Sequence, residues 1–228
     1  MNRWLRVLGV SAVLVLVGCA SPPPLVPVEA AGTSVVVVSF IDAEVRIAQR
    51  GPVPFASSDA SVMRPDWGLR ERAEDSAVSA LEAMQTFRSI RVARAPVGTP
   101  LSAPVFEGAD LVLLLHPVTT VEPVLATQGL SPLDGVGVRQ RSGVLGPRKT
   151  IAYASVAVVV ASVREQRVVR VGRGASYTVV DNDSLGEGAL LASAHEEMAK
   201  ASLLNQLGSA VRSAIALTGL QVRGDNAR

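Results

Sequence analysis

Cysteine, histidine and aromatic residues are scarce in this 228-residue chain. It contains one cysteine and two histidines, and its aromatic residues are two tryptophans, two tyrosines and four phenylalanines. A single cysteine excludes an intrachain disulfide and a metal site built from several thiolates. With so few aromatic rings and so much valine and alanine, the sequence predicts a core of small aliphatic side chains.

A membrane-spanning hydrophobic run and a strong net charge are also missing. The longest leading apolar run, 7–17, ends in Gly18 and is soon followed by three prolines, whereas a spanning helix needs about 20 apolar residues. The formal charge is +2, and two of the 22 basic residues, Arg3 and Arg6, lie within residues 1–18. The remainder is formally neutral, so we expect no nucleic-acid partner.

The first 21 residues have the parts of a secretory signal: a basic start, an apolar stretch and then small residues. The junction Leu16-Val17-Gly18-Cys19 resembles the bacterial lipobox, in which lipid is added to the cysteine thiol and the leader is cut just before it. The resemblance implies that residues 1–18 are a cleaved lipoprotein signal peptide and that Cys19 is the lipid attachment site. Several acyl chains on one cysteine give a stable membrane anchor.

The residues that follow predict where the anchored protein resides and how it is organised. Ala20 and Ser21, without an aspartate after the cysteine, match the sorting rule for export to the outer membrane, so we expect its periplasmic face. Residues 19–32 contain four prolines and predict a lipidated, semi-extended tether. Residues 33–222 are expected to form a single periplasmic α/β domain, and residues 223–228 a disordered tail.

Hydrophobic periodicity predicts five strands and two main helices. The continuous apolar run Val35–Val38 favours a strand buried on both faces. The expected strands are 33–41, 89–94, 109–121, 151–163 and 168–180, and the expected helices are 66–87, capped by Asp66, and 184–219. The fold class is therefore α/β (α+β): one mixed, largely antiparallel sheet packed by two helices, in the order β-α-β-β-β-β-α. Gly172 and Gly174 predict a bulge in the last strand.

Two long segments between these elements, 42–65 and 122–150, are rich in glycine and proline and predict protruding loops. The second carries a local basic cluster of Arg139, Arg141, Arg148 and Lys149. If exposed, this cluster would suit an acidic protein surface, a glycan or anionic headgroups, and it is the predicted partner-binding site. Trp67 is interpreted as a side chain packed on its own domain.

Motifs for catalysis or cofactor binding are incomplete. His195-Glu196 begins like the zinc-protease sequence H-E-x-x-H, but position 199 is alanine, so the second ligand is missing. A phosphate-loop-like stretch from Gly143 has Arg148 in place of the glycine before Lys149, and a strand is expected to follow. We therefore expect no catalytic residues, no cofactor and no metal.

The layout resembles the envelope proteins related to the amino-terminal domain of TolB, including the penicillin-binding-protein activator lipoproteins and the curli-secretion lipoproteins. The resemblance covers roughly residues 33–218 and is carried by the opening strand VVVVSF (35–40), the stretch FRSIRV (87–92), GADLVL (108–113), the hairpin and the closing helix. It implies a non-catalytic binding, scaffold or activator module for another envelope protein or assembly. The alternative is an auxiliary lipoprotein of an envelope lipid or solute transporter, and an enzyme is the third class. The oligomeric state stays open.

Overall fold

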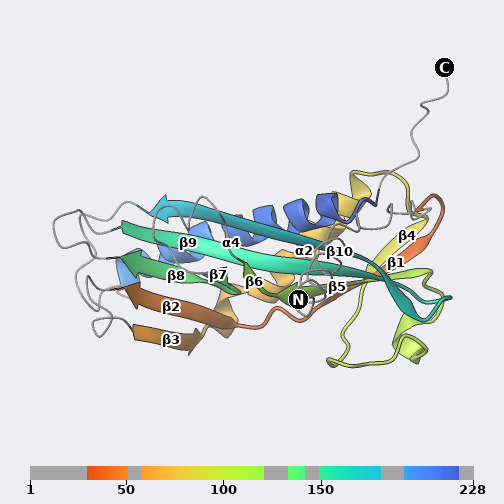
Figure 1. The fold of residues 1–228 in the computed structure, drawn as a ribbon, viewed down its shortest axis with the longest axis horizontal. Helices are drawn as coiled ribbons and strands as arrows, with labels where there is room; N and C mark the ends of the chain where they lie inside the picture. Colours follow the sequence, from red (N-terminus) through yellow and green to blue (C-terminus); the bar gives the residue numbers. More distant parts are fainter. Residues whose placement is uncertain (1–29, 51–57, 121–132, 142–148, 181–192, 221–228) are drawn as a thin grey trace, which may run out of the picture.

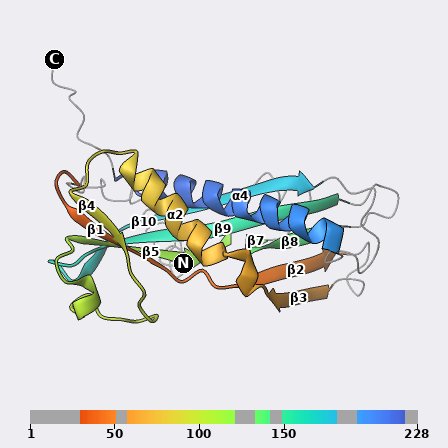
Figure 2. The same cartoon turned by 180° about the vertical axis from the view of Figure 1, so that it is seen from behind.

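The computed structural model describes residues 30–50, 58–120, 133–141, 149–180 and 193–220. Within them the chain forms a mixed eight-stranded sheet with two helices on one face, as Figures 1 and 2 show from opposite sides. This confirms the predicted fold class. The lipid attachment site, most of the tether and the tail lie outside the described residues. No helix in the described part of the chain is both long and apolar enough to cross a membrane.

The elements have the following bounds. The main sheet contains β1 (Ser34–Ser39), β2 (Glu44–Arg50), β3 (Ser58–Met63), β4 (Ser89–Val92), β5 (Leu111–Pro117), β8 (Val136–Arg141), β9 (Lys149–Ser162) and β10 (Arg167–Val180). A small second sheet pairs β6 (Thr119–Thr120) with β7 (Leu133–Asp134). The helices are α2 (Leu69–Glu82) and α4 (Ser193–Leu217), with short 3-10 turns η2 (Pro65–Trp67) and η3 (Pro104–Phe106).

Strand β9 organises the sheet because it is long enough to pair with three strands. One of its edges pairs along its whole length with β10, as the predicted hairpin requires. Its other edge pairs first with β8 and then with β5, where Ala154 lies opposite Val136 and Val156 opposite Pro117. The sheet therefore divides into two wings, β8-β2-β3 at one end and β5-β1-β4 at the other.

The predicted central strand, Val35–Val38, is confirmed. β1 runs parallel to both β4 and β5, and all six of its residues are buried. Parallel neighbours need a crossover, which α2 supplies between β1 and β4. Because both faces of β1 are covered, apolar side chains are expected at consecutive positions, as the four valines provide.

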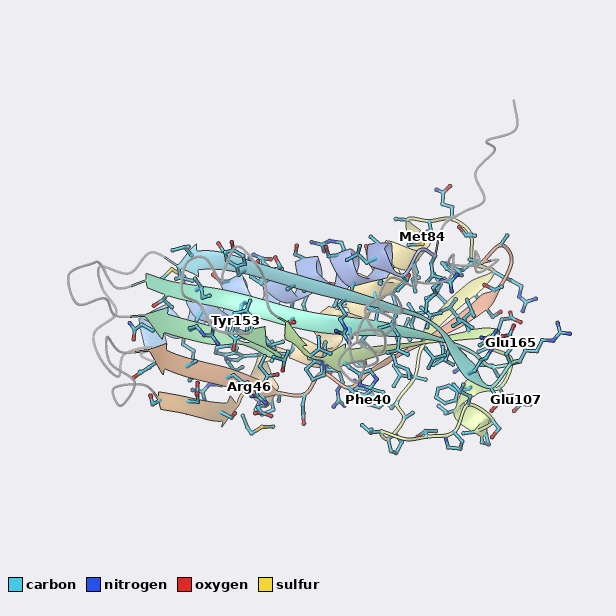
Figure 3. All side chains as sticks on the ribbon, in the orientation of Figure 1. Phe40, Arg46, Met84, Glu107, Tyr153 and Glu165 are labelled. Atoms are coloured by element: carbon cyan, nitrogen blue, oxygen red, sulfur yellow. The ribbon has the colours of Figure 1, made fainter. Side chains whose placement is uncertain are left out.

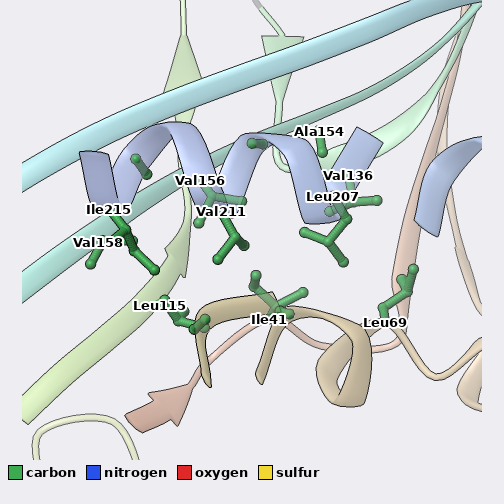
Figure 4. Close-up of a cluster of buried hydrophobic side chains, with 14 of the residues drawn as sticks. Ile41, Leu69, Leu115, Val136, Ala154, Val156, Val158, Leu207, Val211 and Ile215 are labelled. Carbon is green, nitrogen blue, oxygen red and sulfur yellow. The ribbon is translucent and has the colours of Figure 1, made fainter. Parts of the chain in front are cut away.

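The main core lies between the sheet and the two helices (Figure 4). α4 packs over β10 and β9, while α2 packs over β1, β4 and α4. The stripe predicted on the closing helix faces the sheet, since Leu207, Val211 and Ile215 are at most 1% exposed. Burial of such side chains stabilises the fold by roughly 1.5–3 kcal/mol each.

Glycines in β10 allow α4 to approach this closely. A Cβ on Gly172 would lie 2.9 Å from the Thr218 backbone nitrogen and closer still to the Ala214 carbonyl oxygen, whereas real Cβ atoms stay beyond about 3.0 Å. Gly174 meets the helix backbone one turn earlier in the same way. The prediction that these glycines mark a bulge is wrong, because the register shift lies between Val168 and Arg170.

The helix ends agree only partly with the prediction. α2 begins after Gly68, which has a left-handed backbone with φ of 65°, and not after a cap at Asp66. Trp67 is 3% exposed and packs in the main core, as interpreted. Gly219, with φ of 66°, follows the end of α4 at the position expected for a helix stop. The capping pattern at 184–187 lies outside the described residues.

Both long loops are wrongly predicted, since the segment 42–65 contains β2 and β3 and the segment 122–150 contains β7, β8 and the start of β9. β2 places Val45 and Ile47 toward the helices at alternate positions, and β8 does the same with Val136 and Val138. These are short period-two patterns. The surrounding glycines and prolines led to the interpretation as loops.

The sheet face opposite the helices differs between the two wings. Over β1 and β5 it is covered by the segment around η3, whose Phe106 packs on Val36, Val38 and Val112. Over β8 and β9 a smaller cluster contains Leu133, Ile151 and Tyr153. Polar side chains gather beside this second cluster, on the helix-free face.

Candidate functional site: a polar cavity on the helix-free face

A cavity of about 320 Å³ opens on the helix-free face of the β8-β2-β3 wing. Its charged and hydroxyl-bearing lining residues are Arg46, Asp59, Ser61, Asp134, Arg139 and Tyr153. Figure 3 shows Arg46 and Tyr153 together at this end of the sheet. Several hydrogen-bonding groups of both charge signs converge on this one hollow, so it is the candidate binding site.

Strand register brings these residues together from distant parts of the sequence. Ser61 of β3 lies opposite Arg46 of β2, which lies opposite Gly137 of β8, which lies opposite Tyr153 of β9. Residues paired across neighbouring strands share one face of a sheet. The next row, two residues further along, places Arg139 on the same face.

Gly137 makes room for the Tyr153 side chain. A Cβ at position 137 would lie 2.8 Å from the Tyr153 hydroxyl and closer still to the Arg46 carbonyl oxygen. The ring therefore crosses the glycine and reaches toward the cavity, where its hydroxyl lies 3.5 Å from the Asp134 carbonyl oxygen. Any larger residue at 137 would displace the ring from the site.

An ion pair between Arg46 and Asp134 holds the cavity rim. The turn at Gly135 positions Asp134. Gly135 has a φ of 65°, a left-handed conformation that favours glycine, and its amide donates to the Val118 carbonyl at 3.1 Å. The same arginine lies 3.9 Å from Glu44. Arg46 and Asp134 also line a smaller cavity of about 190 Å³, so the ion pair borders both cavities.

Beneath the rim, Arg139 and Tyr153 form a buried cationic and aromatic pair. Arg139 is 4% exposed, and its guanidinium lies 5.8 Å from the centre of the Tyr153 ring. Burial is the main reason that the pKa of the Tyr153 hydroxyl is raised above its ordinary value of 10. The phenol therefore stays protonated at neutral pH, where it can donate and accept hydrogen bonds.

The prediction that the basic cluster lies in an exposed loop is wrong. Arg139 and Arg141 belong to β8, and Lys149 begins β9 directly opposite Arg141. Of the four, Arg139 lines the cavity and is buried. The side chains of Arg141 and Lys149, together with Arg148, lie outside the described residues, and Cys19 does too.

The sequence interpretation missed Arg46, Asp59, Asp134 and Tyr153. Tyr153 carried a usable signal, because it is a hydroxyl-bearing aromatic residue inside an otherwise small and apolar strand. Arg46 occupies the polar position between two apolar ones in β2. Only the pairing of β2 with β8, about 90 residues apart, places these residues in one site.

A third hollow, a crevice of about 430 Å³, lies beyond the carboxyl ends of the parallel strands β1 and β4. Its two arginines are engaged by acidic residues. Arg70 lies 3.9 Å from Asp42, and Arg94 lies 3.2 Å from Glu71 and 3.8 Å from Glu74. These contacts tie α2 to the strand ends, so the crevice is interpreted as structural bracing.

The histidines do not add a reactive centre within the described residues. His116 stacks against Phe40 with ring centres 4.6 Å apart, and burial lowers its pKa below 6.5, so it is neutral at pH 7. His195 lies in α4, and its side chain is outside the described part of the structure. In that described part no three His, Cys, Asp or Glu side chains are grouped to hold a metal ion.

Comparison with known proteins gives distant structural neighbours. No family model matches the chain, and no curated protein matches its sequence. Among solved structures, protein XCC0632 of Xanthomonas campestris, from the DUF330 family, is 16% identical with a TM-score of 0.42, over 87% of this chain and 89% of that one. A point variant of the PelC dodecamer from Paraburkholderia phytofirmans is 16% identical with a TM-score of 0.36, over 86% and 94%. Lipoprotein GNA1162 from Neisseria meningitidis is 11% identical with a TM-score of 0.30, over 73% and 96%.

One of these neighbours is a lipoprotein, but the TM-scores are all below 0.5 and the identities all below 25%. Similarity at this level assigns neither a partner nor a process to this chain. The predicted resemblance to the TolB-related group is not confirmed by them.

Proposed function

We propose that this protein is a lipid-anchored envelope lipoprotein whose domain acts as a non-catalytic binding, scaffold or activator module for another cell-envelope protein or assembly. The anchor is the lipid on Cys19, and the site of action is the periplasmic face of the outer membrane. The partner contacts the helix-free face of the β8-β2-β3 wing. The domain holds its partner and transforms nothing.

The observation that carries this proposal is the character of the polar cavity. Its rim is an Arg46–Asp134 ion pair with half-exposed side chains, and its floor is the buried Arg139–Tyr153 pair. Charges of both signs, fixed by a rigid sheet, suit recognition of a polar protein surface. A neutral phenol and an ion-paired carboxylate are poor general bases, which favours binding over catalysis.

The anchor is tested by replacing Cys19 with serine. Serine has no thiol, so the variant should take up no labelled palmitate and should no longer float with membranes in a density gradient. The matched control is Ser21→Ala, which leaves the thiol in place and should be labelled normally. Label and flotation in the Cys19→Ser protein would refute the anchor.

The binding face is tested by photo-crosslinking in cells. A photoreactive residue replaces Ser61, which is exposed at the cavity, and in a control protein replaces Ser79, which is exposed on α2. We expect a crosslinked envelope protein from position 61 and none from position 79. Adding Asp134→Asn, which keeps the shape of the rim but removes its negative charge, should reduce the crosslink several-fold.

The identity of the captured protein distinguishes the two functional classes. A structural protein or synthase of the envelope supports the scaffold proposal, and a component of an inner-membrane transporter supports the auxiliary-transporter alternative. Equal crosslinking from positions 61 and 79 would contradict the assignment of the binding face. A crosslink that Asp134→Asn leaves unchanged would remove the ion pair from the site.

A further inference from the structure

Strand β10 forms one lateral border of the sheet over 14 residues. One of its edges pairs with β9, and no described strand pairs with the other. Figure 1 shows β10 along the upper border of the sheet with α4 behind it. α4 packs on one face of this strand and does not run along its outer edge.

The direction of the free main-chain groups follows from the bonds of Ser155 in β9. Its amide donates to the Gly135 carbonyl at 2.8 Å, and its carbonyl accepts from the Val118 amide at 3.1 Å. Both groups therefore point away from β10. Ala175, which lies opposite Ser155, is consequently in a non-hydrogen-bonded pair, so its own amide and carbonyl point outward.

The same orientation recurs at every second residue of an antiparallel strand. Outward groups are thus expected at Val171, Arg173, Ala175, Tyr177 and Val179, which also share the helix-free face of the sheet. The bulge between Val168 and Arg170 lies outside this stretch, and the register from Arg170 to Val180 is regular. The edge accordingly offers an unbroken row of donors and acceptors about nine residues long.

The side chains along this row have a definite chemistry. Val171 is 50% exposed and Val179 is 59% exposed, and Tyr177 between them is half-buried. Arg173 is exposed and makes no ion pair within the described residues. The whole strand contains three arginines and no acidic residue. An added strand that places valine-like side chains opposite the valines and a carboxylate opposite Arg173 would complement it.

Exposed charges and bulges also protect sheet edges from unwanted pairing. Here the bulge protects only the beginning of β10, and the two most exposed valines of the regular stretch lie at its two ends. A single positive charge between them excludes basic segments more than acidic ones. The edge is therefore selective in charge.

We propose that the outer edge of β10 binds an extended, acidic segment of a partner protein by antiparallel strand addition. Main-chain bonds to the outward groups of residues 171–179 supply affinity, and Arg173 selects a carboxylate at the position opposite it. This surface adjoins the floor of the polar cavity, because Tyr177 of β10 lies opposite Tyr153 and packs against it. The proposal stands whether or not the cavity binds the partner.

The test uses two synthetic nine-residue peptides and the full-length protein purified in detergent. Both peptides have valine at the positions opposite Val171 and Val179 and threonine elsewhere, except opposite Arg173, where one has glutamate and the other lysine. We expect the glutamate peptide to bind about five- to tenfold more tightly than the lysine peptide. Amide exchange at Arg173, Ala175 and Tyr177 should slow on binding, as measured by hydrogen-exchange mass spectrometry or NMR.

Three variants make the test specific. Arg173→Glu should reverse the preference, so that the lysine peptide binds more tightly. Ala175→Pro removes one outward donor while leaving the β9 ladder bonds in place, so both peptides should lose binding but melting should change little. Arg173→Lys is the conservative control and should keep the glutamate preference.

Four outcomes would overturn the proposal. They are no binding of either peptide at millimolar concentration, equal binding of the two, binding that Arg173→Glu does not alter, and exchange protection at β3 or β4 in place of β10. Protection of β10 that depends on protein concentration without peptide would assign the edge to a second copy of this chain. If Ala175→Pro fails to fold, the charge reversal at Arg173 decides the matter.

Discussion

Substituting Gly174 by alanine tests whether the closing helix is held against the sheet by direct backbone contact. The added methyl would lie 2.6 Å from the Ala214 backbone nitrogen and nearer to the Ala210 carbonyl oxygen. Since side-chain Cβ atoms stay beyond about 3.0 Å, relieving the contact with the nitrogen alone needs a shift of about 0.4 Å, and the nearer carbonyl oxygen requires α4 or β10 to move further than that. Both obstacles are backbone atoms on the sheet-facing side of α4, so no flexible side chain can relieve the clash.

The expected cost is at the upper end for overpacking, about 3 kcal/mol, partly offset by about 0.4–1 kcal/mol from the stiffer unfolded chain. For a domain of this size a loss of about 2–3 kcal/mol lowers the melting temperature by roughly 4–12 °C. Circular dichroism of the purified protein, with urea unfolding at 25 °C, measures both quantities. The slope of the urea transition should stay unchanged.

Gly208 offers a matched control within the same helix. A Cβ there would approach Ser76 Oγ at 3.0 Å, Arg72 Nη2 at 3.2 Å and Arg212 Nη1 at 3.3 Å, all of which are movable side-chain atoms. Alanine also favours a helix interior over glycine by about 1 kcal/mol. Gly208→Ala should therefore be neutral or stabilising. If Gly174→Ala melted like the wild type, or if the two variants fell equally, the backbone contact would not be what fixes α4.

Two further substitutions probe buried charges. Burial is the main reason that the pKa of Glu74 is raised above 4.5, so folding favours the protonated carboxyl and the wild type loses stability as pH rises from about 4.5 through the higher folded pKa. Above this window Glu74→Gln should be more stable than the wild type, and below it the difference should disappear. Urea unfolding at several pH values measures this difference, and the opposite sign would contradict the prediction. Arg139→Glu should lower the free energy of unfolding by about 3–5 kcal/mol, because residue 139 is only 4% exposed. The control, Arg164→Glu in the exposed hairpin turn, should change it by about 0.5 kcal/mol or less. Equal melting temperatures for the two variants would show that Arg139 is not buried.

The parts of the fold that the sequence predicts are those with strong local signals. Val35–Val38 and Leu111–Leu115 are apolar at every position, which only a strand covered on both faces tolerates, and both became central strands. The four-residue gap between β9 and β10 predicted their hairpin. In α4 the recurrence of Leu207, Val211 and Ile215 specified the face that packs on the sheet.

The parts that were missed depend on contacts between distant segments. β2 and β8 pair in parallel, with Ile47 opposite Val138, and neither strand has more than a short period-two pattern among glycines and prolines. The Arg46–Asp134 ion pair follows from this pairing, because one partner lies on β2 and the other just before β8. No local pattern near either residue indicates the other. The candidate site was therefore beyond sequence reasoning, apart from Arg139, for which the environment was predicted wrongly.

The placement of both helices on one face explains where polar chemistry can exist in this domain. A charge such as Arg46 or Asp134 beneath α4 would lose its hydration without a route to water, a cost of several kcal/mol per ion. On the other face the η3 segment covers only the β5-β1 wing, so the β8-β2 wing can keep an ion pair at its rim. The outer edge of β10 is a further place for polar contacts, because α4 covers one face of that strand and not its edge. The cavity and the edge are connected through Tyr153 and Tyr177, which pair across β9 and β10 and pack in one cluster. If one partner covers both surfaces, the effects of Asp134→Asn and Ala175→Pro on the free energy of its capture should therefore depart from additivity by more than about 0.5 kcal/mol, as a double-mutant cycle measures.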